Sequence, residues 1–239
     1  MEYEITDIAE YLSVIQERTE QKTQAGTDED LIFRGQIVDH PLVPKILRLT
    51  PKANFIHTEK ALFREFKRAN PMLIDSFVVD DWDYLTLGQH FGLPTRLLDW
   101  STNALTALWF ATNLEPLRNQ DSANAIVWIL SVKESNFVCE GDMHDPFEIP
   151  EIKIFRPRII KQRINNQLGV FSIHSNDALE KNISINDSSI YAPNLIKIKI
   201  PCDRIKPIQN DLNTLGVNAF SIFPELEGLC AYLQWKFFK

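Results

Sequence analysis

The stretch TRLLDWSTNALTALWFAT, residues 95–112, joins an apolar strand pattern directly to an apolar helix pattern. Its first six residues predict a strand, and leucine and tryptophan then recur at helical spacing over residues 104–113. Ser101 or Thr102 can cap this helix, because a hydroxyl oxygen accepts hydrogen bonds from its first free N–H groups. Free backbone N–H groups and small hydroxyls therefore meet at a strand end, which is a common place for an anionic or polyol ligand.

Patterns of the same two kinds extend along the whole chain. Apolar or alternating runs predict further strands at residues 31–35, 125–132, 152–160, 168–174 and 194–200. Helical spacing predicts helices at residues 5–21, 58–70, 82–91 and 202–216, and residues 220–237 are expected to form a strand and then a helix. Because these elements mix without strict alternation or internal repeats, the predicted class is α+β. We expect a helical lead-in at residues 1–25 and a single domain at residues 26–239, built on a central mixed or antiparallel sheet with peripheral helices.

The composition describes one soluble globular protein. The chain has 239 residues, 44% hydrophobic content and a net charge of −7, which is enough apolar material for one core. No stretch concentrates Lys and Arg as a duplex-DNA surface would, so nucleic acid is disfavoured as a partner. The three cysteines form no CxxC pair, and we expect them to be reduced and semi-buried. The acidic N-terminus lacks signal-peptide features and no apolar run approaches the roughly 20 residues of a membrane span, so we expect a cytoplasmic protein.

Two arginines lie inside short apolar segments. Arg34 follows an Ile-Phe pair and precedes Gly35, which allows a ligand or another backbone to approach closely. A buried arginine needs an anion or a set of acceptors around it. Arg96 either bridges buried carbonyl groups or serves a ligand. Period-2 alternation places Asp99 on the opposite face of the strand from Arg96, where it either caps the next helix or takes part in a site.

Two carboxylates, Glu225 and Glu227, stand two residues apart in the segment PELEG. In an extended segment they project on the same side, whereas at a helix start they occupy the first turn and favour the helix dipole. Neighbouring acids can raise the pKa of one member and so provide a base. The five histidines are scattered without metal-ligand spacing, so no metal site is expected.

Four segments together resemble the FRG domain family, named for a motif that stands here as Phe33-Arg34-Gly35. The central block of the family is similar to QHFGLPTRLLDWSTNALTALWFA, its third block to QLGVFSIH and its last block to FPELEGLCAYL, at residues 89–111, 167–174 and 223–233. The resemblance covers about residues 28–236. It identifies the domain at residues 26–239 as an FRG domain.

The order of these motifs is also similar to that of ADP-ribosyltransferases of the arginine–serine–glutamate type, whose sheet is split. The resemblance implies that Arg34 holds a phosphate or ribose of NAD through its bidentate fork. Ser101, with Thr102, would position the nicotinamide ribose or brace the catalytic acid. Glu227, or Glu225, would stabilise the positive charge that develops as nicotinamide leaves.

Four more residues are expected to complete the NAD pocket, namely Gly35, Gln89, His90 and Arg96, although Arg96 has no counterpart role in the transferases. As a lone histidine, His90 either contacts the nicotinamide amide or the acceptor, or is a hydrogen-bonded structural residue.

The leading hypothesis is an NAD-dependent ADP-ribosyltransferase that modifies a macromolecular target, either protein or nucleic acid. The family resemblance implies a bacterial toxin or antiphage effector, with an antitoxin or other neutralising protein as a partner. One alternative is a metal-independent nuclease, in which Arg34, Arg96 and His90 surround a phosphate and Glu227 is the general base. The other alternative is a non-catalytic nucleotide-binding module.

Overall fold

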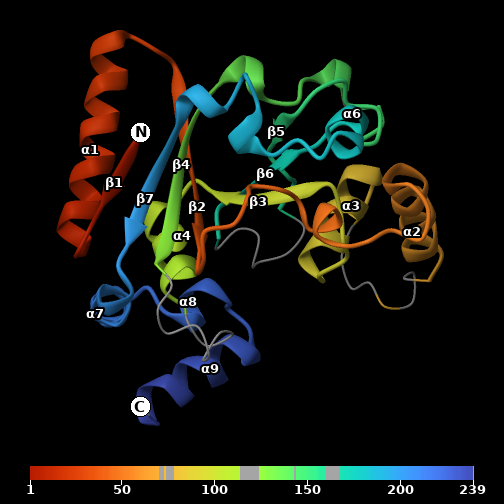
Figure 1. Ribbon diagram of the computed structural model, residues 1–239. Coiled ribbons are helices and arrows are strands. Elements are labelled where there is room, and N and C mark those ends of the chain that lie inside the picture. Colours follow the sequence, from red (N-terminus) through yellow and green to blue (C-terminus); the bar gives the residue numbers. More distant parts are fainter. Residues whose placement is uncertain (70–72, 74–77, 114–123, 143, 160–166, 239) are drawn as a thin grey trace.

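The structure is a computed structural model, and it describes residues 1–69, 73, 78–113, 124–142, 144–159 and 167–238 (Figure 1). Seven strands form one sheet in the order β1-β7-β4-β2-β3-β6-β5. Neighbouring strands are antiparallel, except that β1 runs parallel to β7. The strands are β1 (Glu2–Glu4), β2 (Glu29–Gln36), β3 (Leu97–Ser101), β4 (Ala125–Lys133), β5 (Lys153–Phe155), β6 (Gly169–Ile173) and β7 (Leu195–Ile200).

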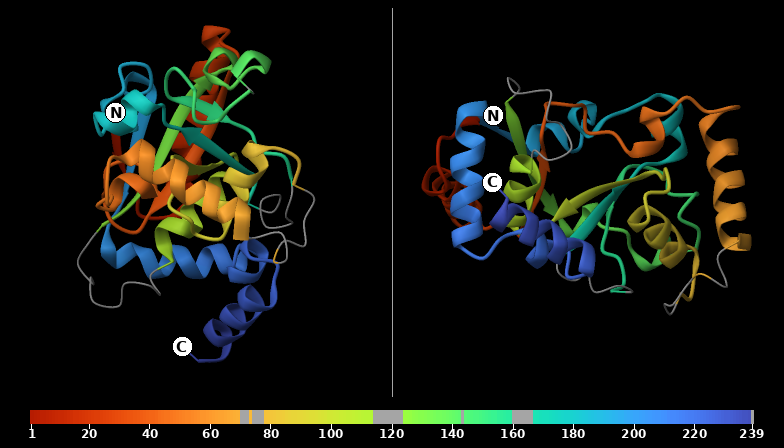
Figure 2. Two further views of the ribbon diagram at one scale, coloured as in Figure 1. Left: turned by 90° about the vertical axis from the view of Figure 1, so that its right-hand side faces the viewer. Right: turned by 90° about the horizontal axis from the view of Figure 1, so that it is seen from below.

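Eight α-helices surround the sheet in the described part of the chain, and α1 and α2 lie at opposite ends of the molecule (Figures 1 and 2). They are α1 (Ile8–Ala25), α2 (Phe55–Ala69), α3 (Asp81–His90), α4 (Ala104–Thr112), α6 (Asn176–Glu180), α7 (Cys202–Thr214), α8 (Ala219–Ile222) and α9 (Leu226–Phe237). Short 3-10 helices occur at η1 (Lys45–Arg48), η3 (Glu134–Asn136), η4 (Glu140–Asp142), η5 (Ile185–Asp187) and η6 (Ala192–Asn194).

Three apolar clusters hold the sheet between its helices. The half made by β1, β7, β4 and β2 packs one face against α1, α4, α7 and α8, in a cluster that includes Tyr11 and Phe33. The half made by β3, β6 and β5 packs against α2 and α3, in a cluster that includes Phe63 and Trp82. The opposite face of both halves shares a third cluster, which includes Trp100. The two halves therefore share one core on one side and have separate helical covers on the other.

The two halves meet at a seam between β2 and β3, where a single residue pair, Phe33 with Ser101, joins the strands. By contrast, β2 pairs with β4 along eight residues and β3 pairs with β6 along five. A paired residue shares its face with its partner, so Phe33 and Ser101 point to the same side of the sheet. Beyond this pair the backbones do not continue the ladder, which leaves side chains to connect the halves.

Gly35 is required by the close approach of α4 to β2. A Cβ atom placed on Gly35 would lie 1.9 Å from the carbonyl oxygen of Ala107 and 2.6 Å from the amide nitrogen of Ala111. Of the two possibilities left open for this glycine, the structure shows approach by another backbone, that of α4. The glycine of the FRG motif thus fixes the strand-to-helix contact at the centre of the fold.

The predicted α+β class with one mixed sheet and peripheral helices is confirmed. Three local predictions are wrong. The strand expected at residues 152–160 is limited to Lys153–Phe155, because Pro157 cannot donate to a strand ladder, and residue 160 lies outside the described residues. The N-terminal segment contains β1 as well as a helix, and Tyr11 of α1 is fully buried in the same core as β4 and β7. The segment expected as a final strand forms α8, since Asn218 caps it and accepts hydrogen bonds from the backbone of Phe220 and Ser221.

The three cysteines are free, as expected, but they are exposed rather than semi-buried. Among the described helices, none combines the length and the apolar character that crossing a bilayer requires.

Candidate functional site

Arg34 lies at the seam and spans it with its side chain. Its Nη1 donates a hydrogen bond to the backbone carbonyl of Asp99 at 2.6 Å, and the same atom lies 3.8 Å from the Asp99 carboxylate. The side chain is 16% exposed. Its Nε is buried and finds no acceptor among the described residues. The guanidinium therefore keeps part of its donor capacity for a group that the chain itself does not supply.

The charges around Arg34 explain why an anion would be favoured there. Burial lowers the pKa of the Arg34 guanidinium, the Asp99 carboxylate raises it, and the neighbouring Arg48 of η1 lowers it again. Desolvation and a second cation both oppose the charged form of Arg34. Because the partly exposed Asp99 offsets this only in part, an added oxyanion would stabilise the cation.

Asp99 is held in place but remains open to solvent. Gln89, in the last turn of α3, donates from Nε2 to the Asp99 carboxylate at 2.9 Å, and its Oε1 accepts a hydrogen bond from the Thr95 hydroxyl at 2.6 Å. The Asp99 side chain is nevertheless 57% exposed. A carboxylate that is oriented by an amide and faces solvent can interact with a bound ligand.

A small pocket of about 90 Å³ opens beside this carboxylate. It is lined by Gln89, His90, Asp99, Trp100, Gln167, Gly169 and Phe171. The Nε2 of Gln167 is a buried donor without a described partner, like the Nε of Arg34. Gln167 lines this pocket, whereas Arg34 does not line it but contacts Asp99, which does. A ligand with acceptor atoms, such as a phosphate or a carbonyl group, would satisfy a donor of this kind.

The two hydroxyl residues assigned to the NAD pocket make contacts within the chain. Ser101 Oγ donates to the carbonyl of Gln167 at 2.6 Å and accepts from the backbone N–H of Asn103 at 3.0 Å. The hydroxyl of Thr102 donates to the carbonyl of Leu168 at 3.4 Å. Neither residue caps α4, because the side chain of Asn103 accepts hydrogen bonds from the backbone N–H groups of Leu105 and Thr106 in the first turn. The hydroxyls connect β3 to the segment before β6, so they position the Gln167 side of the pocket.

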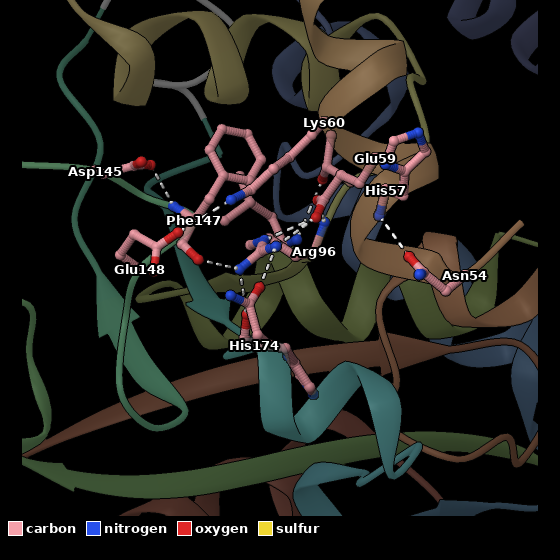
Figure 3. Close-up of polar contacts among 12 residues, drawn as sticks. Asn54, His57, Glu59, Lys60, Arg96, Asp145, Phe147, Glu148 and His174 are labelled. Atoms are coloured by element: carbon pink, nitrogen blue, oxygen red, sulfur yellow. Dashed lines mark hydrogen bonds and ion pairs between the residues drawn. The ribbon is translucent and has the colours of Figure 1, made fainter.

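Arg96 is completely buried and surrounded by acceptors from the chain (Figure 3). Its Nε and Nη2 donate to Oε2 of Glu59 in α2 at 2.9 and 2.6 Å, and its backbone N–H donates to Oε1 at 3.0 Å. Nη1 donates to the carbonyls of Phe147 and His174, and Nη2 also donates to Asn176. The guanidinium lies 4.9 Å from the ring centre of Phe147. Arg96 therefore bridges buried carbonyls and a carboxylate, which corresponds to the structural alternative named for it.

His174 lies beside this cluster and was not singled out by the sequence. It is completely buried, and both of its ring nitrogens lack a described side-chain partner. Burial, followed by the charge of Arg96, lowers the pKa of His174 to about 3. The imidazole is therefore neutral at pH 7 and belongs to the core rather than to the pocket at the seam.

Glu225 and Glu227 lie at the start of α9 and line a different pocket, of about 230 Å³. Glu225 occupies the N-cap position and Glu227 the first turn, so the helical alternative for this pair is the one observed. None of the residues that line the seam pocket also lines this one. The expected meeting of Arg34 with these glutamates is therefore not among the contacts of the described residues, and Asp99 is the carboxylate that approaches Arg34.

The seam consequently brings Arg34, Gln89, His90 and Ser101 of the predicted set together with Asp99, whereas Arg96 and the glutamates lie elsewhere. Sequence reasoning missed Gln167, although its presence in the QLGVFSIH block was a usable signal. Among the described residues, no group of three or more His, Cys, Asp or Glu side chains could hold a metal ion. The arrangement is suited to binding an acceptor-rich anion next to an oriented carboxylate.

Comparisons with known proteins agree with the sequence resemblance over part of the chain. No significant match was found among curated proteins or among solved structures. The matched family segment contains Arg34, Gln89 and Asp99, but it ends before Gln167 and the two glutamates of α9. Residues 29–120 match the model of the FRG domain.

Proposed function

We propose that the protein is an NAD-dependent ADP-ribosyltransferase whose reaction centre is the seam between β2 and β3. The observation that carries this proposal is the buried Nε of Arg34, which finds no acceptor among the described residues, in a side chain that lies 3.8 Å from the exposed carboxylate of Asp99. NAD offers phosphate oxygens to the donors of Arg34 and Gln167, which find no acceptor in the described part of the chain. The similarity to arginine–serine–glutamate transferases is supported by one further feature, the direct pairing of Phe33 with Ser101 on adjacent strands.

In the proposed reaction, the bond between the nicotinamide nitrogen and the ribose C1′ breaks, and nicotinamide leaves with the bonding electron pair. The acceptor then forms a bond to C1′ and loses a proton. Positive charge develops on the ribose during this exchange, so a fixed carboxylate nearby lowers the barrier. We assign this role to Asp99 in place of Glu227, because Asp99 is oriented by Gln89 and lies 3.8 Å from Arg34.

The test is an incubation of the protein with NAD labelled on its adenylate portion and a cell lysate that supplies protein and nucleic-acid acceptors. Arg34→Ala removes a charge-assisted contact and should reduce label transfer about ten- to a hundredfold, the equivalent of about 1.5–3 kcal/mol. Asp99→Asn keeps the shape of the side chain and an oxygen that can accept the hydrogen bond from Gln89. A loss of label transfer in this variant therefore shows that the negative charge of Asp99 is required. Glu227→Gln is the matched control and should retain transfer.

The outcomes separate the two carboxylates. If Glu227→Gln abolishes transfer while Asp99→Asn does not, the original assignment to Glu227 stands and the role given to Asp99 is wrong. If the purified protein shortens RNA without NAD, the nuclease alternative replaces the transferase. Thermal melts of each variant distinguish lost chemistry from lost folding.

A second candidate function is nucleotide binding without turnover. It is favoured by the placement of Glu225 and Glu227 in a pocket that shares no lining residue with the seam. NAD or nucleotide binding that depends on Arg34, with no label transfer to any acceptor, would support this module. The role of toxin or antiphage effector, the neutralising partner and the cytoplasmic location stay predictions from the family resemblance and the composition.

A further inference from the structure

The pocket formed by α4, α7, α8 and α9, here called the α9 pocket, has walls unlike those of the seam. It occupies about 230 Å³. Its lining residues are Trp109, Asn113, Gln209, Asn213, Val217, Asn218, Ala219, Phe223, Glu225, Glu227, Gly228, Ala231, Tyr232 and Trp235. Two of these residues are carboxylates and none is Lys or Arg, so the walls carry negative charge only.

The α9 pocket offers two exposed carboxylates and one unpaired amide oxygen as hydrogen-bond acceptors. Glu225 stands at the N-cap of α9 but accepts no hydrogen bond from the helix, so its carboxylate is not used as a cap. The Oδ1 of Asn213 is a buried acceptor without a partner in the described part of the chain. A buried acceptor left unpaired is unfavourable, and a ligand that donates hydrogen bonds would relieve this.

The remaining walls are aromatic. Trp109 is 5% exposed and packs edge-on against Phe223 at a centroid distance of 5.7 Å. Tyr232 and Trp235 of α9 complete this side. Aromatic faces favour both apolar stems and cations. A bare metal ion is disfavoured by this lining, and the described residues offer no cluster of three metal ligands.

The corner between α8 and α9 fixes the shape of the α9 pocket. A Cβ atom on Gly228 would lie 1.9 Å from the carbonyl oxygen of Phe223, so α9 begins in direct backbone contact with the end of α8. This contact fixes the start of α9, where Glu225 at the N-cap and Glu227 in the first turn line the pocket together with residues of α4 and α7. Beyond the corner, α9 extends away from the sheet toward the C-terminus (Figure 1).

We infer that the α9 pocket binds an organic cation, namely a protonated primary amine on an apolar stem. An ammonium group has three donors and no acceptor, which matches walls that offer two carboxylates and the Asn213 oxygen. The stem would lie against Trp109, Tyr232 and Trp235. This inference goes beyond the proposed NAD chemistry, since it requires neither NAD nor any residue of the seam.

The test is isothermal titration calorimetry of the full chain with n-pentylamine, which is protonated at pH 7, and with n-pentanol, which has the same stem without charge. The amine should bind about tenfold more tightly than the alcohol, because the charged head gains the two carboxylates. The double variant Glu225→Gln/Glu227→Gln should lose this preference. The control variant Glu17→Gln/Glu20→Gln, on the exposed face of α1, makes the same change in net charge and should keep it.

Several outcomes would overturn the inference. Equal binding of amine and alcohol would show an apolar groove without cation selectivity, and binding of neither would show no site. Loss of amine binding in Arg34→Ala would show that the amine depends on the seam, which contradicts an independent α9 pocket. By contrast, the inference is supported if Arg34→Ala loses NAD-dependent transfer but still binds the amine, because the α9 pocket is then an independent site. The amine experiment can therefore be interpreted even if the NAD chemistry fails.

Discussion

Replacing Arg96 by Leu should destabilise the protein strongly, although we do not place this residue in a ligand pocket. The substitution leaves Glu59, whose side chain is 2% exposed, as a buried carboxylate without its counter-ion. It also leaves the carbonyls of Phe147 and His174 without their donor. Breaking a buried ion pair from one side costs about 3–5 kcal/mol. For a domain of this size the melting temperature should then fall by roughly 6–20 °C, at about 2–4 °C per kcal/mol.

The assay is urea unfolding and calorimetry of Arg96→Leu, Glu59→Leu and the double variant. The double variant should be more stable than the sum of the two single losses predicts, because it removes both charges together. Arg68→Leu is the matched control, since Arg68 pairs with Glu65 on the same helix as Glu59 but is 72% exposed, and its loss should cost less than about 1 kcal/mol. A change in Arg96→Leu no larger than in this control would refute the structural role of the cluster.

Three further outcomes follow from the described contacts. Gly35→Ala should cost at least about 1–3 kcal/mol by urea unfolding, because its Cβ would overlap α4, whereas Gly141→Ala should be nearly neutral. The pKa of His174 falls from 6.5 to about 3 on folding, so the unfolded chain binds the extra proton and stability should decline as pH falls from 6.5 toward 3, by up to about 1.4 kcal/mol per pH unit. His174→Gln should flatten this part of the pH profile relative to the control His57→Gln, and an unchanged profile would contradict the assignment. All three cysteines should react with a thiol reagent in the native protein, and protection of any one of them would contradict their exposure.

Local patterns were sufficient to predict most of the fold. The strand and helix on either side of residues 101–103 were predicted within one or two residues, because apolar periodicity and small polar residues mark both elements. The short strand β1 was missed since three residues, two of them charged, carry no strand signal by themselves. Its formation depends on pairing with β7 at the far end of the chain, which is a tertiary effect.

The candidate site was harder to predict because it depends on how strands meet. The sequence allowed Arg96 either a structural or a ligand role, but it could not show that burial gives Arg96 a carboxylate from α2 and leaves Arg34 Nε without an acceptor among the described residues. The partners of Arg96 come from segments 37 to 80 residues away, and no local pattern reports such contacts. The glutamates of α9 were correctly recognised as a pair, yet their separation from the seam follows from the way α8 and α9 turn.

Because a single residue pair joins β2 and β3, the sheet has more strand edges with unpaired backbone groups than its two outermost strands provide. A continuous seven-stranded sheet exposes unpaired peptide groups only along its two outermost strands. Here the facing edges of β2 and β3 are two further edges inside the sheet, and the guanidinium of Arg34 bridges them in place of a backbone ladder. Amide protons along these inner edges should exchange with deuterated solvent faster than those between β2 and β4, although both lie at the middle of the molecule.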